Sequence, residues 1–229
     1  MLQQGDKKKS ILFIFVIIFF LTSINSQQFI DKKKSFYDLK KIEVKGLDEE
    51  INLEIKKNLS FLKNTNIFFV DDKILKDQIG KYEFIENYNV FKSYPSKIIF
   101  ELQRTEFLAV TIKDNETLII GSNGKFINVE KFKNYENLPK VFGKFSAKDF
   151  INFRDIIYKS DLKYKNIKEI FFYPSGRIDI KNKDNILIKL PVKNLKKALV
   201  IANKVIQDEN LNKNIIDFRI PNQLILSNE

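Results

Sequence analysis

An enzyme needs side chains that attack a substrate or transfer protons, and this 229-residue sequence lacks two of the most versatile, histidine and cysteine. That absence excludes a Ser-His-Asp triad, a thiol nucleophile, an imidazole acid–base group and a zinc site built from His or Cys. The 29 Asp and Glu residues are spread along the chain and single out no carboxylate pair. We therefore expect no enzyme, no cofactor and no metal site.

A glycine motif at residues 121–124, Gly-Ser-Asn-Gly, is the sequence's nearest approach to a phosphate-binding loop. It lacks the Lys-Ser/Thr of a P-loop, and no helix is predicted after it. Because Asn-Gly favours positive φ at the centre of a tight hairpin, the sequence predicts a turn here.

The C-terminal stretch NIIDFRIPNQLIL, residues 214–226, is the main candidate for a binding surface. It predicts two short strands, 215–220 and 223–226, joined at Pro221-Asn222, because β-branched and aromatic residues favour a pleated, half-buried surface. Apolar and polar residues alternate along the first strand, which places one of its faces on a core. The last strand either closes the sheet internally or lies at an edge that accepts a strand from another protein.

The formal net charge of +11 raises the question of binding to nucleic acid or anionic lipid. The lysines, however, are scattered among Asn and Ile in almost every segment and form no basic stripe. We therefore predict no specific nucleic-acid binding, and no small-molecule substrate in the absence of a catalytic constellation.

The N-terminus has the pattern of a segment that inserts into a membrane. Lysines flank the apolar run SILFIFVIIFFL on both sides. We predict a cytoplasmic tail at residues 1–9 and a transmembrane signal anchor at residues 10–28, with everything after residue 30 exported. The alternative is a signal peptide cleaved after Ser26, because the run is short for a hydrocarbon core of about 30 Å, although an Ala-x-Ala-like cleavage site is missing.

Residues 40–106 predict a compact unit with the order β-α-α-β-β. Gly46 ends the first strand at a position suited to positive φ, and Tyr94-Pro95-Ser96 forms the turn between the last two strands. The expected elements are a strand at 42–44, a helix capped by Asp48 with an apolar stripe at Ile51, Ile55, Leu59 and Leu62, a helix near 71–79 with Ile74, Leu75 and Ile79 inward, and strands at 85–94 and 97–104.

Residues 107–227 predict an α+β domain built on a largely antiparallel sheet with flanking helices. The Phe pairs at 68–69 and 171–172 are expected in the cores, with one of each pair able to reach the surface. The expected strands lie at 107–113, 117–120, 125–129, 167–173, 176–181, 186–190, 215–220 and 223–226, with an extended segment at 138–143 and helices at 146–158 and 192–208.

Short segments that carry a family likeness are IEVKG at 42–46, YP at 94–95, QR at 103–104, NG at 123–124, LP at 138–139 with Gly143, GRIDI at 176–180 and IDFRIPN at 216–222. Their order and spacing resemble those of the FtsQ/DivIB family of bacterial cell-division proteins, over nearly the whole chain. Two departures are Gln103-Arg104 followed by Glu106, where Glu-Arg and then Pro are frequent, and Ile178, where Trp is common. We expect both departures to affect local packing more than function.

The resemblance implies an N-terminal transmembrane helix, a POTRA domain at 40–106 and an FtsQ-type β domain at 107–227. It also implies a single-pass protein of the bacterial inner membrane, with a cytoplasmic N-terminus and most of the chain in the periplasm. Such a protein is a non-catalytic scaffold of the divisome. It binds FtsB- and FtsL-type partners and links them to septal peptidoglycan synthesis, while its POTRA domain contacts other division proteins.

In that family the FtsB partner adds a strand beside the last strand of the second domain. The partner contacts that the resemblance implies for this chain are Arg219, Ile220, Asn222, Gln223, Leu224, Ile225 and Leu226.

The alternative function is that of a POTRA-containing periplasmic adaptor for export or assembly. Such an adaptor is expected to carry repeated POTRA units or a long barrel, and neither fits in 229 residues.

Overall fold

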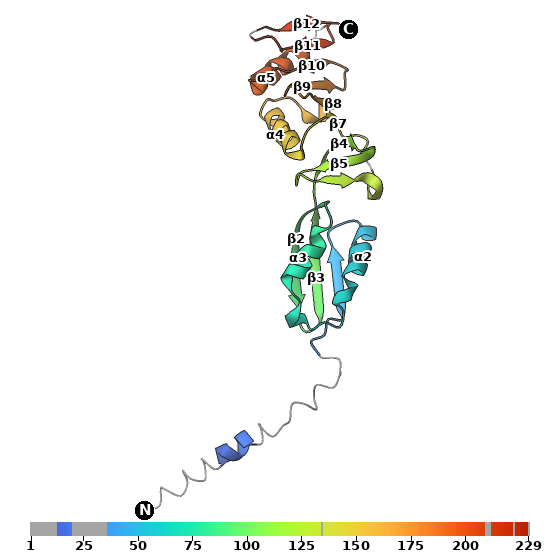
Figure 1. The fold of residues 1–229 in the computed structure, drawn as a ribbon, viewed down its shortest axis with the longest axis vertical. Coiled ribbons are helices and arrows are strands. Elements are labelled where there is room, and N and C mark those ends of the chain that lie inside the picture. Colours follow the sequence, from blue (N-terminus) through green and yellow to red (C-terminus); the bar gives the residue numbers. More distant parts are fainter. Residues whose placement is uncertain (1–12, 20–35, 134, 209–211, 222, 229) are drawn as a thin grey trace, which may run out of the picture.

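The computed structural model describes residues 13–19, 36–133, 135–208, 212–221 and 223–228. Two units follow one another along the long axis of the molecule (Figure 1). The first lies where the chain enters from the N-terminus, and the second extends from it to the C-terminus.

The first unit has the predicted β-α-α-β-β order. Its elements are β1 (Lys41–Lys45), α2 (Glu49–Asn58), the 3-10 turns η2 (Leu59–Leu62) and η3 (Ile67–Phe69), α3 (Asp72–Gly80), β2 (Ile85–Ser93) and β3 (Lys97–Arg104). The three strands form a sheet in the order β1-β3-β2, in which β1 and β3 run parallel and β2 and β3 form an antiparallel hairpin. The Tyr94-Pro95 peptide bond in the hairpin turn is cis. The predicted stripe on α2 and η2 is buried against the sheet.

Two side chains in the first unit depart from the sequence prediction. Asp48 precedes α2 as expected, but its side chain caps no helix N–H and instead accepts a hydrogen bond from Nη1 of Arg104 at 3.0 Å. Ile74 is exposed, whereas Leu75 and Ile79 are buried. Residues four apart share one face of a helix, and Ile74 lies about 100° away from that face.

The prediction that the Phe68–Phe69 pair enters the core is wrong, because both side chains are exposed. The short turn η3 puts Ile67 in the core instead, with no exposed area, and directs the two rings outward. In the second pair, Phe171 and Phe172, both side chains are half-buried, and only Phe172 packs against the core, so the prediction is confirmed in part.

The second unit is built on one nine-stranded sheet in the order β12-β11-β10-β9-β8-β7-β4-β5-β6. Among the described residues, five of its eight strand pairs are antiparallel, in agreement with the prediction of a largely antiparallel sheet, and the pairs β4–β7, β7–β8 and β10–β11 are parallel. Helical crossovers account for two of these parallel pairs, because α4 links β7 to β8 and α5 links β10 to β11. The elements are β4 (Phe107–Lys113), β5 (Glu116–Gly121), β6 (Phe126–Asn128), η4 (Val129–Lys131), β7 (Lys140–Gly143), α4 (Ala147–Tyr158), η5 (Tyr164–Asn166), β8 (Ile167–Phe172), β9 (Ile178–Asn182), β10 (Leu187–Lys189), α5 (Leu195–Ile206), β11 (Ile215–Asp217) and β12 (Ile225–Ser227).

Both helices cover the same face of this sheet (Figure 1). The helix α4 begins after Ser146, which caps it in a capping box with Asp149. The helix α5 is shorter than predicted, because Asn194 takes a left-handed conformation with φ of 63° and the helix begins only after it. A row of fully buried side chains crosses five strands beneath the helices: Val141, Ile170, Ile180, Ile188 and Ile216.

The two units share apolar contacts at the β6 end of the large sheet. Ile119 on β5 and Ile127 on β6 are buried, with 0% and 2% of their area exposed, in the hydrophobic cluster of the first unit. Phe132, just after η4, packs edge-on against Phe84 and Phe107, with ring centroids 5.3 and 4.9 Å apart. The domain limits expected from the sequence, at 106 and 107, stay a prediction, since this cluster draws on both sides of them.

A polar contact lies at the same joint. Asn123, at the tip of the β5–β6 hairpin, donates from Nδ2 to the backbone oxygens of Glu83 at 2.8 Å and Ile85 at 3.3 Å. Its backbone N–H donates to Oγ1 of Thr105 at 3.1 Å. The hairpin that the sequence predicts from Asn-Gly thus also fastens the second unit to the first.

Most of the predicted membrane anchor, residues 10–28, and the whole predicted tail, residues 1–9, lie outside the described residues. Residues 13–19 are helical. Among the residues that the structure describes, none of the helices has the length and apolar character needed to cross a membrane.

Candidate protein-binding edge

The strand β12 forms one end of the nine-stranded sheet and pairs with β11 through Asp217↔Ile225, Ile216↔Leu226 and Ile215↔Ser227. No other strand of the described residues lies beside it. In Figure 1 this end of the sheet is the one farthest from the first unit.

The direction of the backbone groups on β12 follows from the bonds that β11 makes on its other side. The C=O of Asn214 and the N–H of Phe218 bond to β10. Successive residues of a strand point their backbone groups to opposite sides, so residues 215 and 217 face β12. Ile225 and Ser227 therefore bond to β11, and Leu226 points its N–H and C=O to the outer edge of the sheet.

Apolar side chains surround this outer edge. Leu224, Ile225 and Leu226 each expose 41% of their area, and Ile220, in the preceding turn, exposes 47%. Leu226 lies in register with Ile216 on the helix-covered face, so Ile225 lies on the opposite face. An added strand would meet apolar groups on both faces of the edge.

An ion pair holds the chain between the last two strands. Arg219 donates from Nε to both carboxylate oxygens of Asp217, at 3.0 and 2.9 Å, and from Nη2 to Oδ2 at 2.6 Å. Burial alone would raise the pKa of the Asp217 carboxyl, but the hydrogen bonds from Arg219 outweigh it and hold that pKa below its ordinary value. Asp217 is buried and the Arg219 side chain is half exposed, so the pair presents a cation beside the edge.

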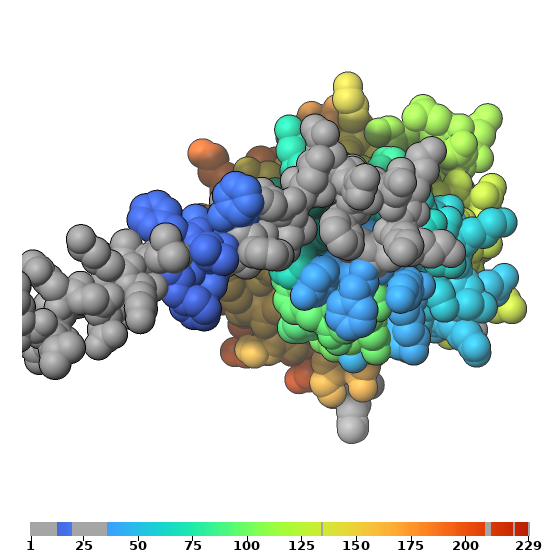
Figure 2. All heavy atoms as spheres, turned by 90° about the horizontal axis from the view of Figure 1, so that it is seen from below, coloured from blue at the N-terminus to red at the C-terminus, as the bar shows by residue number. Residues whose placement is uncertain are grey.

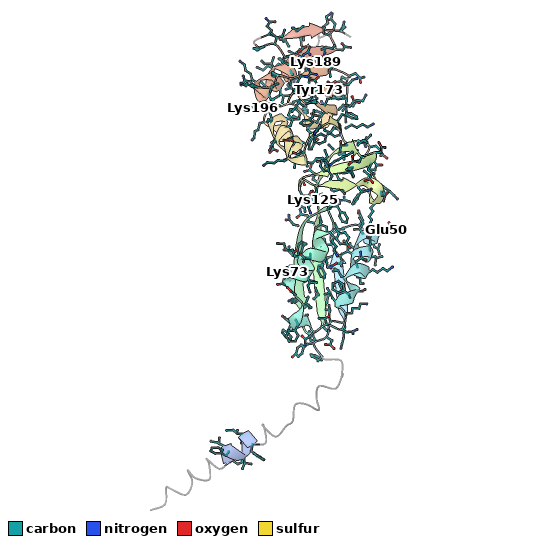
Figure 3. The ribbon with its side chains drawn as sticks, in the orientation of Figure 1. Glu50, Lys73, Lys125, Tyr173, Lys189 and Lys196 are labelled. Carbon is teal, nitrogen blue, oxygen red and sulfur yellow. The ribbon has the colours of Figure 1, made fainter. Side chains whose placement is uncertain are left out.

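Further charges continue across the helix-free face of the sheet. Lys189 on β10 is in register with both Asp217 on β11 and Asp179 on β9. Burial raises the pKa of Asp179, against the attraction of Arg177, whose Nε lies 3.1 Å from Oδ1. Figure 3 shows Lys189 and Tyr173 in this part of the sheet. Sequence patterns do not predict this row of charges, because its members come from separate strands.

The predicted contact residues do not all take the positions expected for them. Arg219 and Ile220 follow β11, which ends at Asp217, instead of continuing it to residue 220. The Arg219 side chain and its backbone N–H both turn back to Asp217, which ends the strand early. Gln223 donates its N–H to the carbonyl of Ile220 at 3.2 Å, within the turn. Asn222 lies outside the described residues.

The second predicted strand is displaced by one or two residues. β12 spans Ile225–Ser227, whereas the sequence predicts residues 223–226. Ser227 therefore belongs to the edge and was missed, since it follows the last apolar residue of the run. In the described part of the chain no three His, Cys, Asp or Glu side chains are grouped as metal ligands, and what the edge offers is hydrogen bonding, apolar contact and charge.

Comparison with known proteins gives two family matches. Residues 38–103 match the POTRA domain of FtsQ type, and residues 109–219 match the C-terminal domain of the cell division protein FtsQ/DivIB. The second match ends at Arg219, so β12 lies beyond it.

Two similar relatives are cell division proteins. FtsQ of Bradyrhizobium diazoefficiens is 21% identical over 165 residues, which cover 71% of this chain and 48% of that protein. DivIB of Clostridium botulinum strain Hall is 27% identical over 195 residues, which cover 74% of this chain and 73% of that protein. The chain thus spans about half the length of the first relative and nearly three quarters of the second.

Among solved structures, the major extracytoplasmic domain of DivIB from Geobacillus stearothermophilus aligns with 47% of this chain and 98% of that one, at 14% identity. The TM-score is 0.34, which is too low to support an argument on the fold.

Proposed function

The chain belongs to the FtsQ/DivIB family of cell-division proteins, and we propose that it is a scaffold of the bacterial divisome that binds its partners by strand addition at β12. Proteins of this family are non-catalytic division scaffolds associated with the membrane. The absence of His and Cys from the sequence agrees with that role. The proposed partners are small membrane proteins of the FtsB and FtsL type, through which the chain is linked to septal peptidoglycan synthesis.

The observation that carries this proposal is the outward direction of the Leu226 backbone groups on an edge strand. An incoming strand gains affinity from main-chain hydrogen bonds and specificity from alternate side chains. Leu224 and Leu226 would supply contacts on one face, and Ile225 on the other. Arg219 would add a cation for an acidic residue of the partner.

The proposed topology is a single pass through the inner membrane by residues 10–28, with residues 1–9 in the cytoplasm and the two folded units in the periplasm. β12 lies at the end of the large sheet farthest from the first unit (Figure 1). The proposed partner edge therefore lies away from the proposed anchor, and the first unit is left for other division proteins.

The test compares two substitutions at one position. Leu226→Pro and Leu226→Ala both remove the leucine side chain, but only proline removes the outward N–H. Because that N–H faces away from β11, proline leaves the β11–β12 hydrogen bonds intact. Full-length tagged chains are expressed in cells, extracted from membranes and used for co-purification, with circular dichroism of each variant to check folding.

We expect the proline variant to retain about tenfold less of a small coiled-coil membrane partner than the alanine variant, or less still. The reason is that proline removes one edge hydrogen bond and its ring clashes with the incoming strand. Equal retention by the two variants would contradict strand addition. Removing all residues from Ile215 onward is a poorer test, since Ile216 and Phe218 belong to the core.

A further inference from the structure

Five aromatic side chains gather at the end of the first unit where the chain enters it. We call them the aromatic cap: Phe36, Tyr37, Phe68, Phe69 and Tyr94. The N–H of Ile67 donates to the carbonyl of Tyr37 at 2.9 Å, and Ser96 accepts from the N–H of Lys40 at 2.8 Å. These bonds place the η3 turn and the β2–β3 turn beside the entering chain.

Four members of the cap form a continuous series of ring contacts, edge-on from Phe36 to Tyr37 and from Tyr37 to Phe68, and stacked from Phe68 to Tyr94. Ring centroids are 5.5 Å apart for Phe36 and Tyr37, 5.1 Å for Tyr37 and Phe68, and 5.0 Å for Phe68 and Tyr94. Phe69 follows Phe68 in the η3 turn and exposes 80% of its area. Soluble proteins rarely leave such a contiguous aromatic surface without a partner, so this end of the unit is suited to contact with something apolar.

The position of the cap in the chain identifies what it meets. If residues 10–28 anchor the protein, only eight residue steps separate the anchor from Phe36, which is roughly 28 Å of fully extended chain. The cap therefore stays close to the bilayer surface. Figure 2 looks onto this end of the molecule, where the first residues of the folded unit, in light blue, lie beside the green strands of the same unit.

We propose that the aromatic cap docks the first unit onto the headgroup region of the bilayer. Aromatic rings concentrate at the membrane–water interface, where a flat apolar body contacts acyl chains and a polar edge stays hydrated. Tyr37 and Tyr94 carry such a polar edge. Three lysines at residues 32–34 immediately precede the cap in the sequence and suit anionic headgroups. This inference rests on the proposed anchor.

The sequence contains no tryptophan, so a single substitution creates a unique fluorescent probe. The full chain is reconstituted into vesicles of phosphatidylcholine and phosphatidylglycerol with brominated acyl chains, which quench tryptophan at the membrane. Three variants are compared: Phe69→Trp in the cap, Phe15→Trp within the proposed anchor, and Tyr158→Trp on α4 in the second unit. Tyr158 is exposed and serves as the remote control.

We expect strong quenching of Phe15→Trp, quenching of Phe69→Trp to at least about half that extent, and none of Tyr158→Trp, as an interfacial position of the cap requires. If Phe15→Trp is quenched and Phe69→Trp is not, the anchor stands and the docking inference is overturned. If Phe15→Trp is also unquenched, the proposed anchor itself fails, and the docking inference fails with it.

Discussion

One nine-stranded sheet ends in two different ways. At β6, Ile127 is 2% exposed and packs into the core of the first unit. At β12, by contrast, Ile225 is 41% exposed, although among the described residues neither terminal strand has a further strand beside it. Sheet edges are liabilities that proteins cover unless they serve a purpose. A short terminal strand with an isoleucine thus joins two parts of one chain at one end, and at the other end a similar strand leaves the exposed edge where we propose that a partner binds.

The largest expected difference between the two edges is in stability. Ile127→Ala leaves a cavity in the shared core and should lower the free energy of unfolding by about 2–5 kcal/mol. The matched Ile225→Ala removes a half-exposed side chain and should cost less than about 1 kcal/mol. Guanidinium unfolding of the full chain in detergent, followed by circular dichroism, measures both. Equal losses of unfolding free energy in the two variants would contradict the difference between the closed edge at β6 and the open edge at β12.

A smaller effect is expected from the polar contact at the closed edge. Asn123→Ala removes the donor to the carbonyls of Glu83 and Ile85, which should cost about 1–2 kcal/mol of unfolding free energy. The control is Asn128→Ala, whose side chain accepts only a local bond from the N–H of Glu130 among the contacts that the structure describes. Limited proteolysis between the two units should be faster for Asn123→Ala than for the parent chain, and unchanged for Asn128→Ala. Unchanged proteolysis would show that the apolar contacts suffice to hold the joint.

The smallest effect concerns the open edge and depends on pH. The pKa of Asp217 is lower in the folded chain than in the unfolded one, so its ion pair with Arg219 stabilises the fold above the ordinary aspartate pKa of about 4. That contribution is lost as the pH falls through the lower folded value. Asp217→Asn should therefore show a weaker loss of stability below about pH 4 than the parent chain.

Other carboxylates lose stability in the same acid range, which makes a comparison necessary. Hydrogen bonds from Lys41 and Lys97 lower the pKa of Glu43 to about 2. The variant Glu43→Gln, remote from the edge, therefore serves as the reference. If the unfolding free energy of Asp217→Asn follows the same pH profile as that of the parent chain, and only Glu43→Gln departs from it, the ion pair between Asp217 and Arg219 contributes nothing to the stability of the fold.

Local pattern predicted most of the fold. Helical spacing located the buried stripe of α2 and predicted α4 at 146–158, close to its observed bounds Ala147–Tyr158. The Asn-Gly pair marked the β5–β6 hairpin, although nothing local showed that its Asn123 reaches into the first unit. The parallel pairings also escaped prediction, since strand order is decided by contacts distant in sequence.

The sequence predicted that the C-terminal residues form the candidate edge, but it did not predict where the two closing strands begin and end. Apolar alternation suggested that the first closing strand runs to residue 220, yet the bonds from Arg219 back to Asp217 end it at residue 217. Two members of the aromatic cap, Phe68 and Phe69, were predicted in the core because they are as apolar as core residues. Their exposure follows from the η3 turn, which places Ile67 inside.

The central claim is that β12 has one closed side and one open side, and amide hydrogen exchange along residues 225–227 tests it residue by residue. In the free chain the N–H groups of Ile225 and Ser227, which face β11, should exchange slowly, and that of Leu226 should exchange fast. In the complex co-purified from membranes, Leu226 should become as protected as its neighbours. Protection of Leu226 in the free chain, or its continued fast exchange in the complex, would contradict the account.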